Sequence, residues 1–321
     1  MIRQHAKATL DLLRATVSLW TSKNAFQLAG ALAFYTLFSM APLLIIVIAM
    51  TGVIFGEAAV RGEIAGQVAR VVGPDAGQIV EETVRRVRIE EAGLVPTLVG
   101  VAVLLFGATT VFAQMQAALN SIWDVRPKPS RSGVLSFALT RLISFGMVLV
   151  IGFLLLVSFL ASMVLSALVR FADEWLPVPE LLAAGLDLSV SLVVAILLFG
   201  MIFKVLPDVR LSWGHVFRGA VLTGVLFVVG QYLISFYLTR AGPASAYGAA
   251  GSLVAILMWV YYSTLIVFFG AAFTREYVRR TGGVIAPSPG AVKTRTEIVE
   301  DWRRPAGGPT DGAEEIEGAE E

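Results

Sequence analysis

Long stretches of this sequence carry no charged side chain. The first runs from Gly30 to Phe55, about 26 residues, and has Pro42 near its middle. A helix needs about 20 apolar residues to cross the hydrocarbon core of a bilayer, so this stretch is long enough to span one. Further stretches have the same character, and only 15% of all residues are charged. The chain is therefore expected to fold in lipid rather than in water.

Six apolar stretches are each predicted to form a transmembrane helix. The predicted spans cover 30–55, 94–115, 137–169, 181–205, 216–238 and 248–274. The third would be roughly 50 Å long as a helix, so it has to tilt, protrude or kink. The predicted fold class is all-α, a polytopic membrane helical bundle with six transmembrane helices that occupies 25–277.

Three further segments are predicted outside the spans. Residues 1–24 have apolar residues at helical spacing, which predicts a cytoplasmic amphipathic helix that either lies at the lipid headgroups or packs on the protein itself. Residues 57–93 are polar with two apolar stripes, and they predict an extracytoplasmic amphipathic helical hairpin. Residues 278–321 are rich in glycine, proline and acid, which predicts a disordered acidic cytoplasmic tail.

The distribution of basic residues predicts the orientation of the bundle. Six spans place both termini on one side, and the segments next to the spans on that side carry fourteen lysines and arginines, without the four of the tail, against seven on the other. Cytoplasmic segments of membrane proteins carry such an excess. Both termini are therefore predicted to be cytoplasmic.

The residue inventory argues against several kinds of chemistry. The chain has no cysteine, and its two histidines, His5 and His215, lie far apart in the sequence, so no metal site is expected. No phosphate-binding loop with a lysine is found, and no cofactor is expected. The basic loops are explained by membrane orientation without a nucleic-acid partner. No enzymatic activity is predicted.

Several short motifs occur in an order typical of one protein family. They are Leu32–Leu43 (LAFYTLFSMAPL), Leu119–Val125 (LNSIWDV), Leu206-Pro207, Trp213, Tyr247–Gly251 (YGAAG) and Leu257–Tyr262 (LMWVYY). With this order, the chain from Ala25 to Tyr277 resembles the YihY/BrkB family of bacterial inner-membrane proteins.

The resemblance implies a six-span, multi-pass protein of the bacterial inner membrane. Family members have been linked to virulence and serum resistance, transport has been suggested for them, and some were once labelled ribonuclease BN. Ribonuclease activity is not expected here, because no histidine pair or metal-binding acid cluster is present. The sequence departs from the family at Ala272, where a Gly-Ala-Glu pattern would have an acid.

A transporter or channel-like function of unknown substrate is the leading prediction, because polar side chains within spans commonly lie on solute pathways. The alternative is an envelope lipid-handling or scaffold protein without solute transport. The depth of Asp187 would separate the two. Membrane lipids are the expected partners, and homo-oligomerisation stays open. The candidate pathway or cavity-lining residues are Tyr35, Ser39, Pro42, Gln114, Asn120, Asp187, Gln231, Ser252, Tyr261 and Tyr262.

Overall fold

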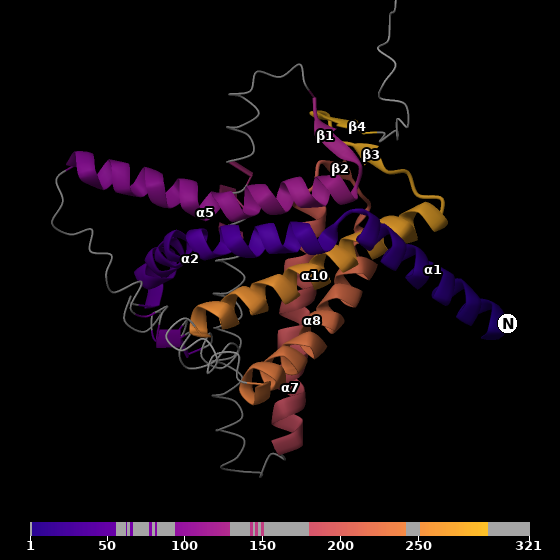
Figure 1. Ribbon diagram of the computed structural model, residues 1–321, viewed down its shortest axis with the longest axis horizontal. Coiled ribbons are helices and arrows are strands. Elements are labelled where there is room, and N and C mark those ends of the chain that lie inside the picture. Colours follow the sequence, from indigo (N-terminus) through magenta and orange to yellow (C-terminus); the bar gives the residue numbers. More distant parts are fainter. Residues whose placement is uncertain are drawn as a thin grey trace, which may run out of the picture.

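The structure, a computed structural model, describes residues 2–55, 94–128, 180–241 and 251–294 and a few isolated positions between them. This part of the chain is mostly helical (Figure 1). Its helices are α1 (Ile2–Ser22), α2 (Ala25–Phe55), α5 (Leu94–Ile122), α7 (Glu180–Val205), α8 (Trp213–Ala241) and α10 (Gly251–Arg280). Apart from isolated positions, the predicted hairpin at 57–93 and the predicted third span at 137–169 lie outside the described residues.

Each of the other five predicted spans overlaps one long helix within the described residues. The stretches 30–55 and 94–115 fall within α2 and α5, and the last three fall on α7, α8 and α10. Within the described residues, three segments are long and apolar enough to cross a membrane: Leu188–Val205, Trp213–Ile234 and Leu253–Arg280. Ala25–Met40 is a shorter apolar segment. These lengths and compositions fit a membrane protein.

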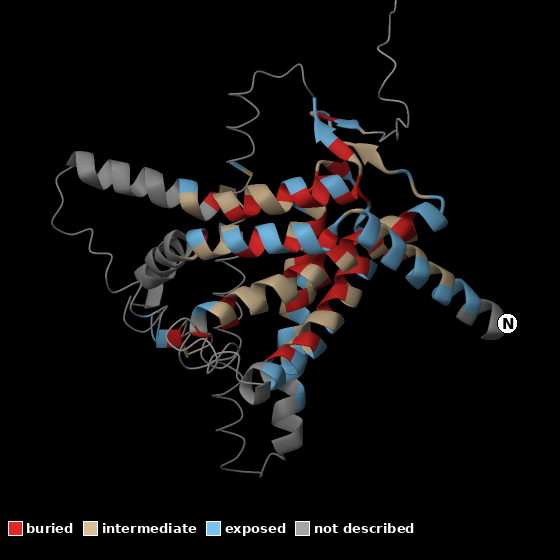
Figure 2. Ribbon diagram, in the orientation of Figure 1, coloured by how far each residue is buried: buried red, intermediate tan, exposed pale blue. Residues whose placement is uncertain are grey.

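The helices pack as neighbouring pairs that converge at one end. α2 contacts α5, α7 contacts α8, and α10 contacts α8, α2 and α1. Buried positions concentrate where the helices converge (Figure 2). Leu119, Phe203, Leu206 and Phe268 are fully buried there. The apolar core thus fixes the relative positions of the helix ends.

Four chain segments meet at this convergent end. They are the α1–α2 turn, the loop after α5, the α7–α8 loop and the segment after α10. We call it the basic end, because Lys23, Arg126, Lys204 and Arg275 all belong to it. Asn24, with φ of 53°, forms the turn between α1 and α2, a conformation that asparagine tolerates better than most residues.

Two small antiparallel strand pairs close the basic end. β1 (Val125–Pro127) pairs with β4 (Ala291–Lys293), and β2 (Val209–Arg210) pairs with β3 (Ala286–Pro287). The all-α prediction is therefore correct for the helices and misses these strands.

The segment 281–294, which we call the strap, differs from the prediction of a disordered tail from residue 278. α10 continues to Arg280, and the strap then crosses both loops of the basic end. The backbone N–H groups of Ser288 and Thr294 donate to the carbonyls of Asp208 and Asp124, at 2.9 and 2.7 Å. These partners order a segment whose composition alone suggested disorder. Residues 295–321 lie outside the described residues.

Candidate functional site

Two polar clusters lie at the C-terminal end of α5. One is centred on Asp124 and the other on Asp208. Both occur at the basic end, where polar side chains from several helices meet above the apolar core. We take these clusters as the candidate site.

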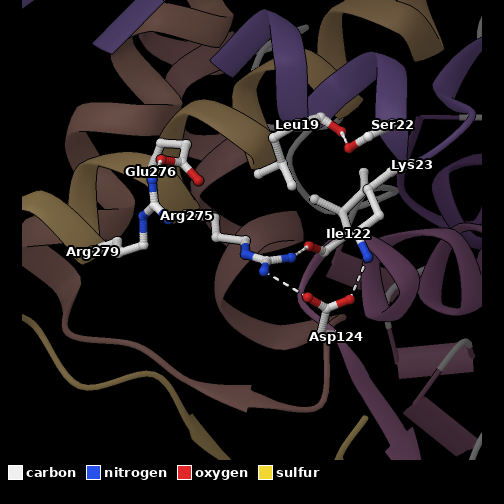
Figure 3. A network of polar contacts seen from close by, with 8 residues as sticks. All are labelled: Leu19, Ser22, Lys23, Ile122, Asp124, Arg275, Glu276 and Arg279. Carbon is white, nitrogen blue, oxygen red and sulfur yellow. Dashed lines mark hydrogen bonds and ion pairs between the residues drawn. The ribbon is translucent and has the colours of Figure 1, made fainter. Parts of the chain in front are cut away.

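The first cluster joins three parts of the chain through Asp124 (Figure 3). Asp124 directly follows the end of α5 and has φ of 52°. Its Oδ1 accepts from the Nζ of Lys23, and its Oδ2 pairs with the Nη2 of Arg275 at 2.6 Å. Arg275 also donates through Nη1 to the carbonyl of Ile122. We call this set the Asp124 clamp, because it ties the α1–α2 turn and α10 to the end of α5.

The surroundings of Asp124 change the pKa of its carboxyl group. Burial acts to raise this pKa, but hydrogen bonds from Lys23 and Arg275 and the positive charges of both residues outweigh burial and lower it below 3.8. A carboxylate paired with two cations favours its charged form. The clamp is therefore ionised at neutral pH.

A second acid lies beside the clamp on α10. Glu276 is buried, and its Oε2 is 2.7 Å from the Nη2 of Arg279. It comes one helical turn after Ala272, the position at which the family resemblance predicts an acid. Arg279 is mostly exposed, and Oε2 of Glu276 has no hydrogen-bond partner among the described residues, so this contact is an ion pair without a hydrogen bond.

The second cluster is a two-way hydrogen bond between α5 and the α7–α8 loop. Asn120 donates through Nδ2 to the Oδ2 of Asp208 at 2.8 Å, and it accepts from the backbone N–H of Asp208 at 2.8 Å. Gln116, one turn earlier on α5, donates to the Oδ1 of Asp208 at 3.4 Å. Gln116 and Asn120 are only 5% and 6% exposed, so α5 positions two buried amides against one carboxylate.

These side chains border a cavity of about 300 Å³. Its polar lining residues are Gln116, Asn120, Ser121, Arg126 and Asp208, and Ala113, Ala117, Val125 and Pro127 complete the wall. The Oε1 atom of Gln116 is buried and has no hydrogen-bond partner among the described residues. The lining offers a carboxylate, amides, a hydroxyl and a guanidinium, which suits a small polar solute. Within the described part of the chain, no cluster of three metal-binding side chains is found.

Among the predicted site residues whose side chains the structure describes, only Asn120 lines this cavity. Gln114 is half-buried on α5 and Gln231 is half-buried on α8, and neither belongs to the cavity lining. The side chains of Pro42, Asp187 and Ser252 lie outside the described residues.

The aromatic and hydroxyl candidates lie on α2 and α10. Ser39 is buried and Tyr35 is half-buried on α2. Tyr261 and Tyr262 are half-buried on α10, and Tyr262 lies so close to Gly230 of α8 that a Cβ there would approach its hydroxyl at 2.8 Å. Tyr262 therefore has a packing role between two helices.

The sequence-based predictions did not include the acids of either cluster. Asp124 belongs to the 119–125 motif, and Asp208 directly follows Leu206-Pro207. Both acids lie in loops, whereas the predicted site residues were polar side chains within or near the spans. Asp124 lies within a family motif and Asp208 directly after one, and this was the sequence signal that could have identified both acids.

Comparison with known proteins places most of the chain in one family. A family model described as virulence factor BrkB matches residues 16–294. A UPF0761 membrane protein of Pseudomonas aeruginosa strain LESB58 is 28% identical over 272 residues, which is 84% of this chain and 63% of the relative. One from Idiomarina loihiensis is 30% identical over 203 residues, 63% of this chain and 67% of that protein.

The chain thus spans less than two thirds of the length of the Pseudomonas relative. A further UPF0761 membrane protein, from Chromohalobacter salexigens, is 28% identical over 264 residues, which is 82% of this chain and 62% of the relative. No solved structure matches the chain.

Proposed function

The chain belongs to the virulence factor BrkB family, and from this premise we propose that it is a transporter or channel-like protein of the bacterial inner membrane. Its solute site is the cavity bordered by Gln116, Asn120 and Asp208. The basic end faces the cytoplasm, as expected for the end with the excess of lysine and arginine. No catalytic step is proposed for this site.

The observation that carries the proposal is the pair of buried amides that hold Asp208 at a cavity. Gln116 and Asn120 lie just beyond the predicted span 94–115, and buried amides beside a carboxylate at a cavity are typical of a site that orients a polar solute. A buried oxygen without a partner, such as Oε1 of Gln116, costs about 1–3 kcal/mol. A solute that donated a hydrogen bond to it would recover part of that cost.

The position of the cavity next to the family motifs also supports the proposal. The motif at Leu119–Val125 contributes Asn120 and Ser121 to the lining, and Leu206-Pro207 leads directly into Asp208. Leu119 and Leu206 are fully buried beneath these polar residues. The motifs thus combine apolar anchors with polar lining, which is the arrangement expected of a solute site on a rigid support.

The lining favours a cationic solute. Asp208 is the acid of the cavity, and its carboxylate accepts from neutral amides rather than from a lysine or arginine. The guanidinium in the lining comes from Arg126, which is exposed. A carboxylate held by amides keeps its negative charge available to a cation, whereas an ion pair would neutralise it.

Flux through proteoliposomes tests the proposal. Purified protein would be reconstituted and given proton, sodium and potassium gradients in turn, with empty vesicles as the baseline. We expect flux of at least one of these cations. Asp208→Asn should reduce it roughly tenfold or more, because the carboxylate offsets the loss of hydration by the ion.

Asp11→Asn is the matched control, because it removes an acid from α1 and leaves the cavity intact. Its flux should equal that of the unmodified chain. Asp187→Asn tests whether Asp187, the acid among the predicted pathway residues, contributes to the flux; an unchanged flux would remove it from a coupling role. Absence of flux for all three cations, or equal flux in Asp208→Asn and the unmodified chain, would contradict the proposed site. Movement of labelled lipid between leaflets would then be measured for the lipid-handling alternative.

A further inference from the structure

Helix α1 is held firmly to the bundle by one of its faces. Thr16 is fully buried, and Leu12 and Leu19 are half-buried on the same side of the helix. α1 contacts α10, and Arg280 at the end of α10 donates through Nη2 to the carbonyl of Asp11 at 2.6 Å. With this face, α1 packs on the protein itself, which is one of the two alternatives that its amphipathic sequence left open.

A second face of α1 carries an exposed apolar stripe. Leu10, Leu13 and Val17 are 55%, 37% and 47% exposed. Their spacing of three and four residues places them in one row along the helix. Apolar side chains in a continuous row indicate an interaction surface more strongly than single exposed ones.

Exposed basic side chains border this stripe. Lys7 precedes Leu10 by three residues and Arg14 follows it by four, so both lie next to Leu10 on the helix surface. Both are exposed. The acid on α1, Asp11, is half-buried and lies beyond Lys7 around the helix, away from Leu13 and Val17. The stripe therefore has a cationic edge.

α1 leaves the bundle at the basic end, apart from the apolar helices (Figure 1). A turn at Lys23 and Asn24 separates α1 from the long apolar helix α2. In Figure 1, α2, α5 and α10 run leftward from the basic end and α7 extends downward, whereas α1 leaves the same end to the right. α1 therefore ends at the basic end, which is predicted to lie at the cytoplasmic side of the membrane, and it is not part of the leftward group of apolar helices in Figure 1.

We infer that α1 is an interfacial helix that binds an anionic lipid surface. The stripe of Leu10, Leu13 and Val17 enters the headgroup–acyl boundary, and Lys7 and Arg14 contact anionic headgroups. Amphipathic helices with basic edges bind membranes in this way. The inference rests on the contacts and exposure of α1 and does not depend on the proposed solute site.

Spin labelling tests this inference in the complete protein, because the chain contains no cysteine. Single cysteines would replace Leu13, Val17 and, as the matched control, the exposed polar Ser18. Each variant would be labelled with a nitroxide and reconstituted in vesicles of phosphatidylcholine with and without phosphatidylglycerol. Collision rates would be measured with oxygen, which enters lipid, and with a water-soluble nickel chelate.

With phosphatidylglycerol present, labels at 13 and 17 should collide with the chelate roughly threefold less often than the label at 18, and more often with oxygen. Arg14→Gln should weaken the dependence of this protection on phosphatidylglycerol. Equal chelate access at 13, 17 and 18 would overturn the inference. Labels at 13 and 17 shielded from both reagents would also overturn it, because protein rather than lipid would then cover the stripe. Protection independent of phosphatidylglycerol would contradict the role of the anionic headgroups.

Discussion

At the scale of single residues, Asp124 ties two distant segments of the chain to the end of α5. Its carboxylate binds Lys23 and Arg275, and Arg275 also caps a carbonyl at the end of α5. The two cations come from segments that precede and follow most of the apolar helices in the sequence. Loss of this one side chain would leave both cations and the α5 end without their shared partner.

Replacing Asp124 with asparagine should destabilise the protein by about 1.5–3 kcal/mol, the range for hydrogen bonds to charged groups. The folded-state pKa of Asp124 is lowered below 3.8. The stabilisation is therefore complete at pH values above 3.8 and is lost as the pH falls through the folded-state pKa. Thermal unfolding in detergent, followed by circular dichroism, should show a gap between Asp124→Asn and the unmodified chain that narrows in acid.

Lys128→Gln provides the control for this experiment, because it alters the charge of an exposed side chain in the same loop. It should leave the unfolding temperature nearly unchanged, as exposed charges contribute little to stability. A gap that stays constant from neutral pH to well below the ordinary carboxyl pKa would contradict the ionic role of Asp124.

At the scale of helices, α8 and α10 approach each other through two interlocked Gly-x-x-x-Thr pairs. Gly219 of α8 faces Thr274 of α10, and Gly270 of α10 faces Thr223 of α8. Each threonine hydroxyl donates to the carbonyl of the glycine on its own helix at 2.7 Å. Small residues at this spacing let membrane helices pack closely. A Cβ at either glycine would overlap the facing threonine Oγ1.

Gly270→Ala should therefore force α8 and α10 apart. Both threonines are fully buried, so their side chains have no free space into which they can turn. We expect a loss of about 1–3 kcal/mol, typical of overpacking, measured as a lower unfolding temperature in detergent. Gly30→Ala on α2 is the matched control, because a Cβ there meets no atom within 4 Å. Equal unfolding temperatures for the two variants would show that the close approach is not required.

At the scale of the whole molecule, the basic end brings together segments that are distant in the sequence. The α1–α2 turn contacts the loop after α5 through Lys23 and Asp124, and the strap contacts both that loop and the α7–α8 loop. Basic segments predicted to share one side of the membrane thus lie at one end of the protein. This convergence fits an orientation with the basic end in the cytoplasm.

Reporter fusions test that orientation. Alkaline phosphatase joined after Thr294 should be inactive in cells, because this enzyme requires export to be active, and green fluorescent protein at the same position should fluoresce. Cysteine introduced at Lys128, which is exposed at the same end, should react with a membrane-impermeant maleimide only after the cells are opened. An active phosphatase fusion, or labelling in intact cells, would contradict the cytoplasmic position of the basic end.

Much of the fold can be predicted from the sequence, because the tendency of a segment to enter lipid depends on the apolar side chains of its own consecutive residues. The uncharged stretch from Gly30 to Phe55 and the three last predicted spans each coincide with a single helix. The amphipathic spacing of the first residues likewise coincides with α1. The family motifs are runs of consecutive residues, and the family that they indicate is the one whose model matches residues 16–294.

The candidate site was harder to predict from the sequence, because it depends on residues that meet only in the folded chain. Asn120 is predicted as a site residue because it is a polar residue near a span, but its partner Asp208 comes from a loop that is distant in the sequence. The strap was predicted to be disordered because its own composition supplies no core, and its order comes from strands and hydrogen bonds made with other segments.

The sequence by itself therefore determined that the chain belongs in a membrane, that it is mostly helical and which family it belongs to. Hydropathy and motifs are properties of consecutive residues, so they can be read without the fold. Tertiary structure alone decided which polar groups meet: Asp124 with Lys23 and Arg275, and Asp208 with Asn120. Hydropathy depends on each residue and its neighbours in the chain. A hydrogen bond or ion pair depends on distance in space, which the packing of α5 against its neighbours sets.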